Sequence, residues 1–207
     1  LDPAMGTGGD YAAIQVFELP TFEQVGEWHH NTTPMNQQVR ILQQINKHIH
    51  DSIMEKDSSA TPQIFYSMEN NTIGEAALLR VMDIGEENIM GMFLSEPIRK
   101  GHRRKFRRGF NTTAKHKIDA CTKFKELIEN NKMKINSQLL ISELKDFVAS
   151  GMSYKAKPGQ HDDLVSSCLL MTRMMKVLAD FDPKIFEKWT DRTSELAPMP
   201  IFGSFTG

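Results

Sequence analysis

The stretch Gln160-His161-Asp162-Asp163-Leu164-Val165 decides how the rest of the chain is interpreted. It follows a Pro-Gly turn and precedes a long apolar run that is typical of a buried helix. Two adjacent carboxylates repel each other, and an apolar helix does not need both in order to fold. We therefore expect this helix start to complete a metal site whose other side chains are Asp2 and Glu69.

Strands and helices alternate along the rest of the chain. Alternating β-forming residues between turn residues predict strands over 11–19, 22–29, 63–68, 92–94 and 132–135. Apolar residues at helical spacing predict helices from 33 to about 53, from about 73, from 111–113 to 130, over 137–149 and over 161–179. A turn or hairpin is predicted over 151–159. Such alternation implies an α/β domain with a central mixed sheet flanked by helices.

In such a sheet, Asp2 and Glu69 would lie at the ends of neighbouring strands. A helix beside them would offer Asp162 or Asp163 from its first turn. Taken singly, these acids have ordinary explanations as turn acids or helix-start acids. Together, three carboxylates repel unless a divalent cation lies among them, and oxygen ligands favour Mg²⁺ or Mn²⁺. Two such ions about 3.5–4 Å apart suit phosphodiester hydrolysis.

Composition limits the other possibilities. The 207 residues are 40% hydrophobic, enough for one core, and we expect a domain over 1–182 and a C-terminal tail, docked or flexible, over 183–207. Cys121 and Cys168 lie far apart on apolar helical faces, which predicts buried thiols in a reducing compartment. No signal peptide or apolar run of about 18 residues occurs, which predicts an intracellular protein with no membrane partner. Leu1 is not an initiator Met, and we expect an excised domain or fragment.

The net charge of −1 means that any nucleic-acid partner must be held by a local patch. Seven of the ten residues at 99–108 are Arg or Lys. A solvated loop is the ordinary explanation, but this density in a nearly neutral chain favours contact with DNA phosphates. The candidates are Arg99, Lys100, Arg103, Arg104, Lys105, Arg107, Arg108, Lys115 and Lys117. The chain has no phosphate-binding loop of the Gly-x-x-x-x-Gly-Lys-Ser/Thr type, so it encodes no ATPase.

Three segments in this order carry a family resemblance: Asp2-Pro-Ala-Met-Gly-Thr-Gly-Gly-Asp10-Tyr11, Ile64-Phe-Tyr-Ser-Met-Glu69-Asn-Asn-Thr-Ile-Gly74 and Gly159-Gln-His-Asp-Asp163-Leu-Val165. Over roughly residues 1 to 180 the chain resembles the nuclease half of the large terminase subunit of tailed bacteriophages, most closely the large contractile-tailed phages. The resemblance implies an RNase H-like fold and a two-metal endonuclease that cuts double-stranded concatemeric viral DNA at packaging initiation and termination. It also implies an upstream ATPase domain, a portal protein and a small terminase subunit as partners, in the cytoplasm of the infected bacterium.

By the same resemblance, Asp2, Glu69 and Asp163 match the catalytic, metal-binding acids. Asp162 is adjacent and is either a ligand or a supporting residue, Asp10 matches an acid that assists the site, and His161 matches a position that orients a ligand or water. Because neighbouring residues point about 100° apart on a helix, only one of the two aspartates is expected to be the primary ligand. Two alternatives stay open: a Holliday-junction resolvase or integrase on the same fold, and a non-catalytic DNA- or partner-binding module.

Overall fold

The computed structural model describes residues 1–97, 108–151 and 153–181. Its helices are α1 (Met35–Lys56), α2 (Thr72–Ile84), α3 (Ala114–Glu129), α4 (Gln138–Asp146) and α5 (Asp163–Phe181), with a short 3-10 helix η1 (Glu86–Asn88). Its strands are β1 (Ala12–Glu18), β2 (Glu23–His30), β3 (Phe65–Tyr66), β4 (Met92–Phe93), β5 (Phe147–Ser150) and β6 (Ser153–Ala156). None of the helices in these ranges is long and apolar enough to cross a membrane. The predicted tail over 183–207 lies outside the described residues.

The predicted hairpin near the start of the chain is confirmed. Strands β1 and β2 pair antiparallel from Ala12 opposite His30 to Glu18 opposite Glu23, with an irregularity between Val16 and Phe17. The β-branched and aromatic residues of both strands favour the extended conformation. This hairpin is the longest paired segment of the sheet.

The described strands form three two-stranded pairs, β1–β2, β3–β4 and β5–β6, and short stretches outside them connect the first two into a mixed sheet. Leu1-Asp2 lies between β1 and residues 67–69, because Asp2 N donates to Ala13 O (2.8 Å) and Glu69 N donates to Leu1 O (3.0 Å). Strand β3 pairs parallel with β4, and Phe110 bridges to Glu69 beyond them. At the opposite edge, Lys134 bridges to Glu23 of β2. The strand predicted over 132–135 is reduced to this bridge.

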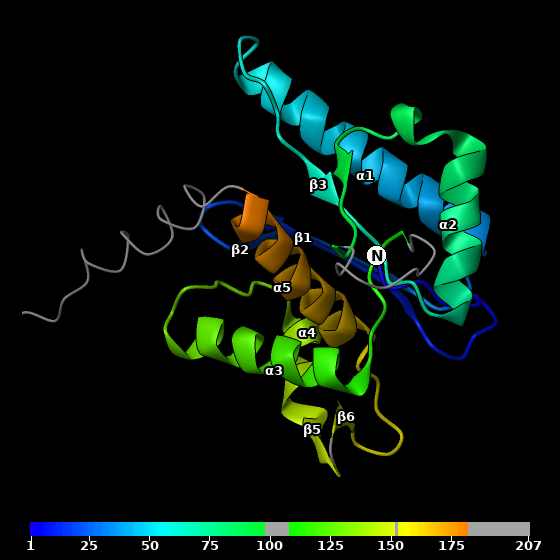
Figure 1. The fold of residues 1–207 in the computed structure, drawn as a ribbon, viewed down its shortest axis with the longest axis vertical. Coiled ribbons are helices and arrows are strands. Elements are labelled where there is room, and N and C mark those ends of the chain that lie inside the picture. The colour runs from blue at the N-terminus through cyan, green and yellow to red at the C-terminus, as the bar shows by residue number, and fades with distance from the viewer. Residues whose placement is uncertain (98–107, 152, 182–207) are drawn as a thin grey trace, which may run out of the picture.

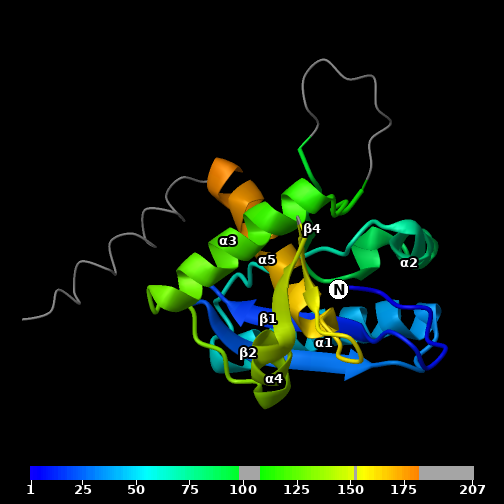
Figure 2. The same cartoon turned by 90° about the horizontal axis from the view of Figure 1, so that it is seen from below.

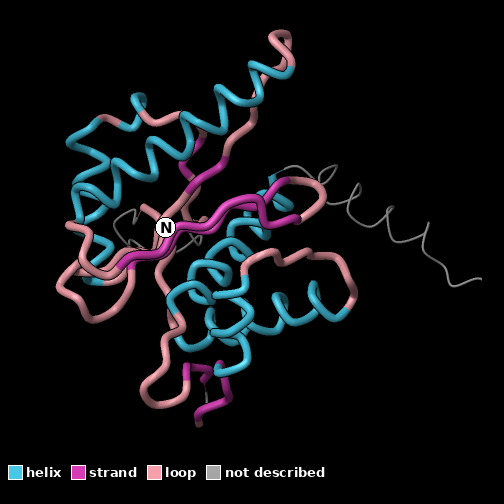
Figure 3. Tube along the Cα trace, turned by 180° about the vertical axis from the view of Figure 1, so that it is seen from behind, coloured by secondary structure: helices cyan, strands magenta, loops and turns pink. Residues whose placement is uncertain are grey.

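The helices cover both faces of the sheet. Side chains alternate between the two faces of a strand, and β1 shows this directly: Ala13 packs in the core formed with α3, α4 and α5, whereas Ile14 packs in the core formed with α1 and α2. Figure 1 shows α1 and α2 on one side of the strands and α3 to α5 on the other, and Figure 3 shows the same layering from behind. The structure is therefore the predicted α/β arrangement.

Helix α5 occupies the centre of the second layer. It packs against both β1 and α3, and Leu164, Val165 and Cys168 in its first two turns are fully buried. Both cysteines are free, with Cys168 buried and Cys121 half-buried. The burial of this helix start fixes where Asp163 can lie.

Several element boundaries differ from the sequence prediction; the strand predicted over 63–68, for example, is reduced to Phe65–Tyr66. The helix predicted over 137–149 ends at Asp146, and Phe147–Ser150 instead pairs antiparallel with β6. The β-forming Phe147 and Val148 favour this strand, and Lys157 closes the base of the hairpin by donating from its backbone N to Asp146 O (2.9 Å). Figure 2 shows the hairpin on the side of the molecule that carries α3 and α4. The final helix begins at Asp163 rather than at His161.

Candidate metal centre

Backbone hydrogen bonds bring Asp2 and Glu69 to the same place in the sheet. Asp2 is bonded to Ala13 of β1 in both directions, at 2.8 and 2.9 Å. Glu69 follows β3 and is bonded through its N–H to Leu1, the residue before Asp2. The two acids thus lie on adjacent extended segments, as their predicted positions at strand ends require.

The Asp2 carboxyl group is buried and lies within electrostatic reach of Glu69. The pKa of Asp2 is raised well above its usual value by burial, by the charge of Glu69 and by a hydrogen bond with the Glu69 side chain. The charge of Asp163 raises it further. Burial and neighbouring negative charge both disfavour the ionised form of Asp2.

A tight turn after Glu69 holds its side chain. Asn71 caps α2 by accepting a hydrogen bond from Gly74 N (2.7 Å), and its amide donates to Glu69 Oε2 (2.8 Å). A Cβ at Gly74 would lie 1.8 Å from Glu69 O, so only glycine fits there. The segment Glu69-Asn-Asn-Thr-Ile-Gly74 therefore does two things: it orients the Glu69 carboxylate and it begins α2.

Asp163 is the first residue of α5, and its side chain turns toward the start of β1. Its Oδ2 accepts a hydrogen bond from Tyr11 N (3.2 Å), and His161 Nδ1 lies 3.6 Å from the same oxygen. Burial raises the pKa of Asp163, the Tyr11 hydrogen bond opposes this, and the charge of Asp10 raises the pKa further. The exposed Asp10 therefore acts on the site through its charge.

The neighbouring aspartate has a different partner. Asp162 precedes the helix, and its Oδ2 lies 3.3 Å from Lys117 Nζ of α3. Lys117 also lies over the ring of Phe147, 5.4 Å from its centroid. The two acids therefore have different surroundings. Asp162 forms an ion pair with Lys117, whereas the charge of Asp163 raises the pKa of Asp2.

The predicted DNA-binding residues fall into two groups. Those at 99, 100, 103, 104, 105 and 107 lie outside the described residues. Arg108 pairs with Glu86 and lies over the Phe93 ring, 5.1 Å from its centroid. Lys115 is exposed at the start of α3, and Lys117 is engaged with Asp162.

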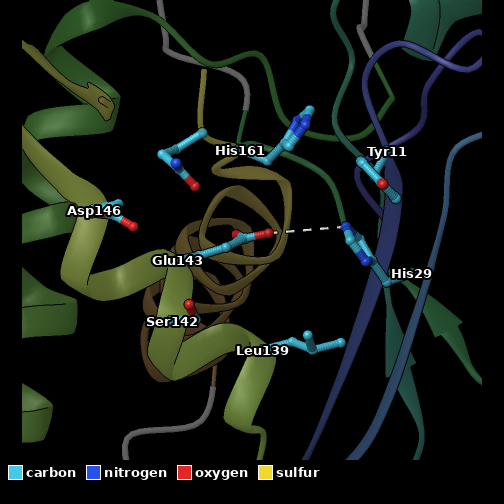
Figure 4. A pocket seen from close by; sticks show the side chains of 8 residues that line it. Tyr11, His29, Leu139, Ser142, Glu143, Asp146 and His161 are labelled. Atoms are coloured by element: carbon cyan, nitrogen blue, oxygen red, sulfur yellow. Dashed lines mark ion pairs between the residues drawn. The ribbon is translucent and has the colours of Figure 1, made fainter. Parts of the chain in front are cut away.

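A small cavity of about 160 Å³ lies beside the Asp163 end of α5. Its lining, shown in Figure 4, comes from Tyr11, β2, α4 and the segment before α5, and comprises Tyr11, His29, Leu139, Ser142, Glu143, Asp146, Gln160 and His161. Burial raises the pKa of Glu143 to about 7, and the Val165 N–H hydrogen bond opposes that rise. Sequence reasoning missed Glu143, because an acid on an amphipathic helix has the pattern of a solvated residue.

Arg173 was also missed, and it supports the Glu69 side of the site. From α5 it donates to Asn111 O and Thr112 Oγ1, both at 3.1 Å, and it pairs with Glu96. Its guanidinium lies over the Phe110 ring, and Phe110 bridges to Glu69. The sequence feature that could have pointed to Arg173 is an arginine within the largely apolar helix α5.

The chemistry of these acids fits hard divalent cations. The candidate ligands are all carboxylate oxygens, the donors that Mg²⁺ and Mn²⁺ prefer. Burial, followed by the charges of nearby acids, raises the pKa of both Asp2 and Asp163. Asp2 and Glu69 lie on adjacent extended segments, and the charge of Asp163 acts on Asp2. Over the described ranges, no three Asp, Glu, His or Cys side chains already converge in metal-binding geometry.

Asp2 and Glu69 thus lie on adjacent extended segments, and Asp163 begins the helix that packs against β1. Residues 1–174 match the family of terminase RNaseH-like domains. The chain belongs to this family. Membership indicates a nuclease function in DNA packaging.

Proposed function

We propose that this chain is a metal-dependent endodeoxyribonuclease that cleaves double-stranded concatemeric viral DNA when packaging starts and ends. The observation that carries the proposal is the backbone pairing that places Asp2 and Glu69 on adjacent extended segments, where the charges of Glu69 and Asp163 both act on Asp2. The proposal extends to a tailed phage of the large contractile-tailed type, acting in the cytoplasm of the infected bacterium. An upstream ATPase domain, the portal protein and the small terminase subunit would be its partners.

Asp2, Glu69 and Asp163 would hold two Mg²⁺ or Mn²⁺ ions. Such ions would supply a nucleophilic water and stabilise charge on the leaving 3′-oxygen. The residues of the chain provide the frame: the sheet fixes Asp2, Asn71 orients Glu69 by its 2.8 Å hydrogen bond, and Tyr11 N orients Asp163. His161 is placed to orient a ligand or water at the Asp163 oxygen, and Asp10 adds negative charge nearby.

Asp162 has a supporting part in this scheme. Its ion pair with Lys117 ties the segment before α5 to α3. Phosphate contacts are assigned to the basic residues at 99–108 and to Lys115, because Lys and Arg bind DNA backbones without reading sequence. This division leaves Asp163 as the primary ligand.

The test is Mn²⁺-dependent nicking of supercoiled plasmid. Glu69→Gln and Asp163→Asn should each lower the rate by roughly 100-fold or more, because several kcal/mol of charge stabilisation is lost with a ligand. Circular dichroism should show both variants folded. Asp119→Asn, which neutralises an exposed acid on α3, is the matched control and should nick at the wild-type rate.

Asp162→Asn should cause a smaller loss than Asp163→Asn. Wild-type nicking by either ligand variant would show the site assignment to be wrong. Cleavage confined to four-way junctions would instead favour a resolvase, and the absence of Mn²⁺ binding at millimolar concentration would favour a non-catalytic module.

A further inference from the structure

The first turn of α5 receives a hydrogen-bond acceptor from another helix. The first amides of an α-helix have no partner within the helix and need one from outside. Val165 N donates to Glu143 Oε2 of α4 at 3.1 Å. An oxygen acceptor at this end of a helix is favoured by the helix dipole as well.

Glu143 is also connected to Asp163 by a second route. His29 Nε2 of β2 lies 3.9 Å from Glu143 Oε1, the contact drawn as a dashed line in Figure 4. The His29 ring stacks on Tyr11 with a centroid separation of 4.0 Å and an interplanar angle of 14°. Tyr11 N in turn donates to Asp163 Oδ2 at 3.2 Å.

Two hydrogen bonds reach the start of α5 from different parts of the chain. Glu143 of α4 accepts from the Val165 amide, and Tyr11, the residue before β1, donates to the Asp163 side chain. The His29 ring lies between the two, stacked on Tyr11, but at 3.9 Å from Glu143 its Nε2 makes no hydrogen bond to a described residue. The two hydrogen bonds hold the backbone after Asp163 and the Asp163 carboxylate relative to the sheet that carries Asp2 and Glu69.

We propose that Glu143 is a positioning residue for Asp163: by accepting a hydrogen bond from Val165 N in the first turn of α5, it fixes the Asp163 carboxylate against the sheet. This inference rests on the proposed nuclease function. On this proposal, residue 143 must provide an oxygen that accepts the hydrogen bond from Val165 N, and it need not carry a negative charge. That requirement separates positioning from direct metal ligation, which needs the charge.

The experiment compares Glu143→Gln with Glu143→Leu in plasmid nicking. Glutamine keeps a carbonyl oxygen for Val165 N and should retain kcat within about 2-fold. Leucine has a similar size, and the adjoining cavity gives it room, but it cannot accept a hydrogen bond. It should lower kcat at least 10-fold while KM for DNA stays within about 2-fold, because a displaced Asp163 impairs the chemical step rather than DNA binding.

Asp146→Asn is the matched control. Asp146 lines the same cavity one turn further along α4 but bonds to Lys157 Nζ at 2.9 Å, and its variant should match the wild type. Equal losses in the glutamine and leucine variants would show that the charge itself is needed and would overturn the proposal. Wild-type kcat in Glu143→Leu, or a comparable loss in Asp146→Asn, would overturn it as well.

Hydrogen exchange provides a readout that does not depend on activity. In Glu143→Leu, amides at 163–167 should exchange at least 10-fold faster than in Glu143→Gln, while amides of β1 keep their protection. Unchanged exchange at 163–167 would contradict the proposed contact. If the leucine variant does not fold, Glu143→Ala serves in its place. A wild-type chain that fails to nick would contradict the proposed function alone, since the exchange comparison still tests the role of Glu143.

Discussion

The cost of ionising Glu143 gives the folded chain a distinctive pH dependence. Burial raises the pKa of Glu143 from 4.5 to about 7, and its side chain is only 11% exposed. The folded state therefore binds more protons than the unfolded state between these pH values. The extra proton binding of folded Glu143 therefore adds to the free energy of unfolding. This stabilisation is fully present below about pH 4.5 and is lost as the pH rises through about 7.

Glu143→Gln should remove this dependence. In the absence of divalent ions, the wild type should lose up to about 3 kcal/mol more than the glutamine variant between pH 4.5 and 8, since each pKa unit corresponds to about 1.4 kcal/mol. Urea unfolding at a series of pH values measures the difference. Asp146→Asn should follow the wild-type curve, and identical slopes for the wild type and Glu143→Gln would refute the account of Glu143.

Adjacent residues in the decisive stretch illustrate what sequence could and could not predict. Two acids before an apolar run indicated a site, but the choice between them rested on resemblance. The expectation that they point about 100° apart assumed that both were helical, whereas Asp162 precedes the helix. Their different environments come from Lys117 and Tyr11, which are distant in sequence and have no pattern that links them to this stretch.

Among the elements, the start of α2 couples helix formation to the site. Asn71→Ala removes the N-cap and the hydrogen bond to Glu69 Oε2 together. It should lower the free energy of unfolding by about 1 kcal/mol and also lower nicking, because Glu69 loses the group that orients it. Thermal unfolding and nicking assays on the same preparation measure both effects.

Thr113→Ala is the control for this prediction. Thr113 caps α3 by accepting from His116 N at 3.2 Å, so its loss should cost a similar stability without a similar fall in nicking rate. If the two variants lose nicking in parallel, cap stability rather than Glu69 orientation explains the effect of Asn71.

Elements with strong periodicity were predicted well, and those determined by distant contacts were not. Apolar periodicity predicted a helix from 33 to about 53, which is α1, and a helix from about 73, which is α2 beginning at Thr72. The end of α4 was missed, because pairing of Phe147–Ser150 with β6 overrides a helical pattern that otherwise continues. Glu143 and Arg173 were missed for a related reason: their partners come from other elements.

At the scale of the whole molecule, the sheet depends on two residues at the start of the chain. Leu1-Asp2 joins β1 to the segment that carries Glu69, so the same short stretch completes the sheet and supplies an acid. The alternation of strands and helices predicted this layering, and α1 and α2 on one face with α3 to α5 on the other confirm it (Figure 1). The order of the short bridges at 110 and 134 could not be predicted, because each consists of one or two residues.

The central claim is that Asp2, Glu69 and Asp163 share divalent ions. Anomalous diffraction from a crystal soaked in Mn²⁺ tests it most directly. The account predicts an anomalous peak roughly 2 Å from carboxylate oxygens of all three residues, with Asp162 still paired to Lys117. The absence of a peak at Asp2 and Glu69, or an ion bound by Asp162 in place of Asp163, would contradict it.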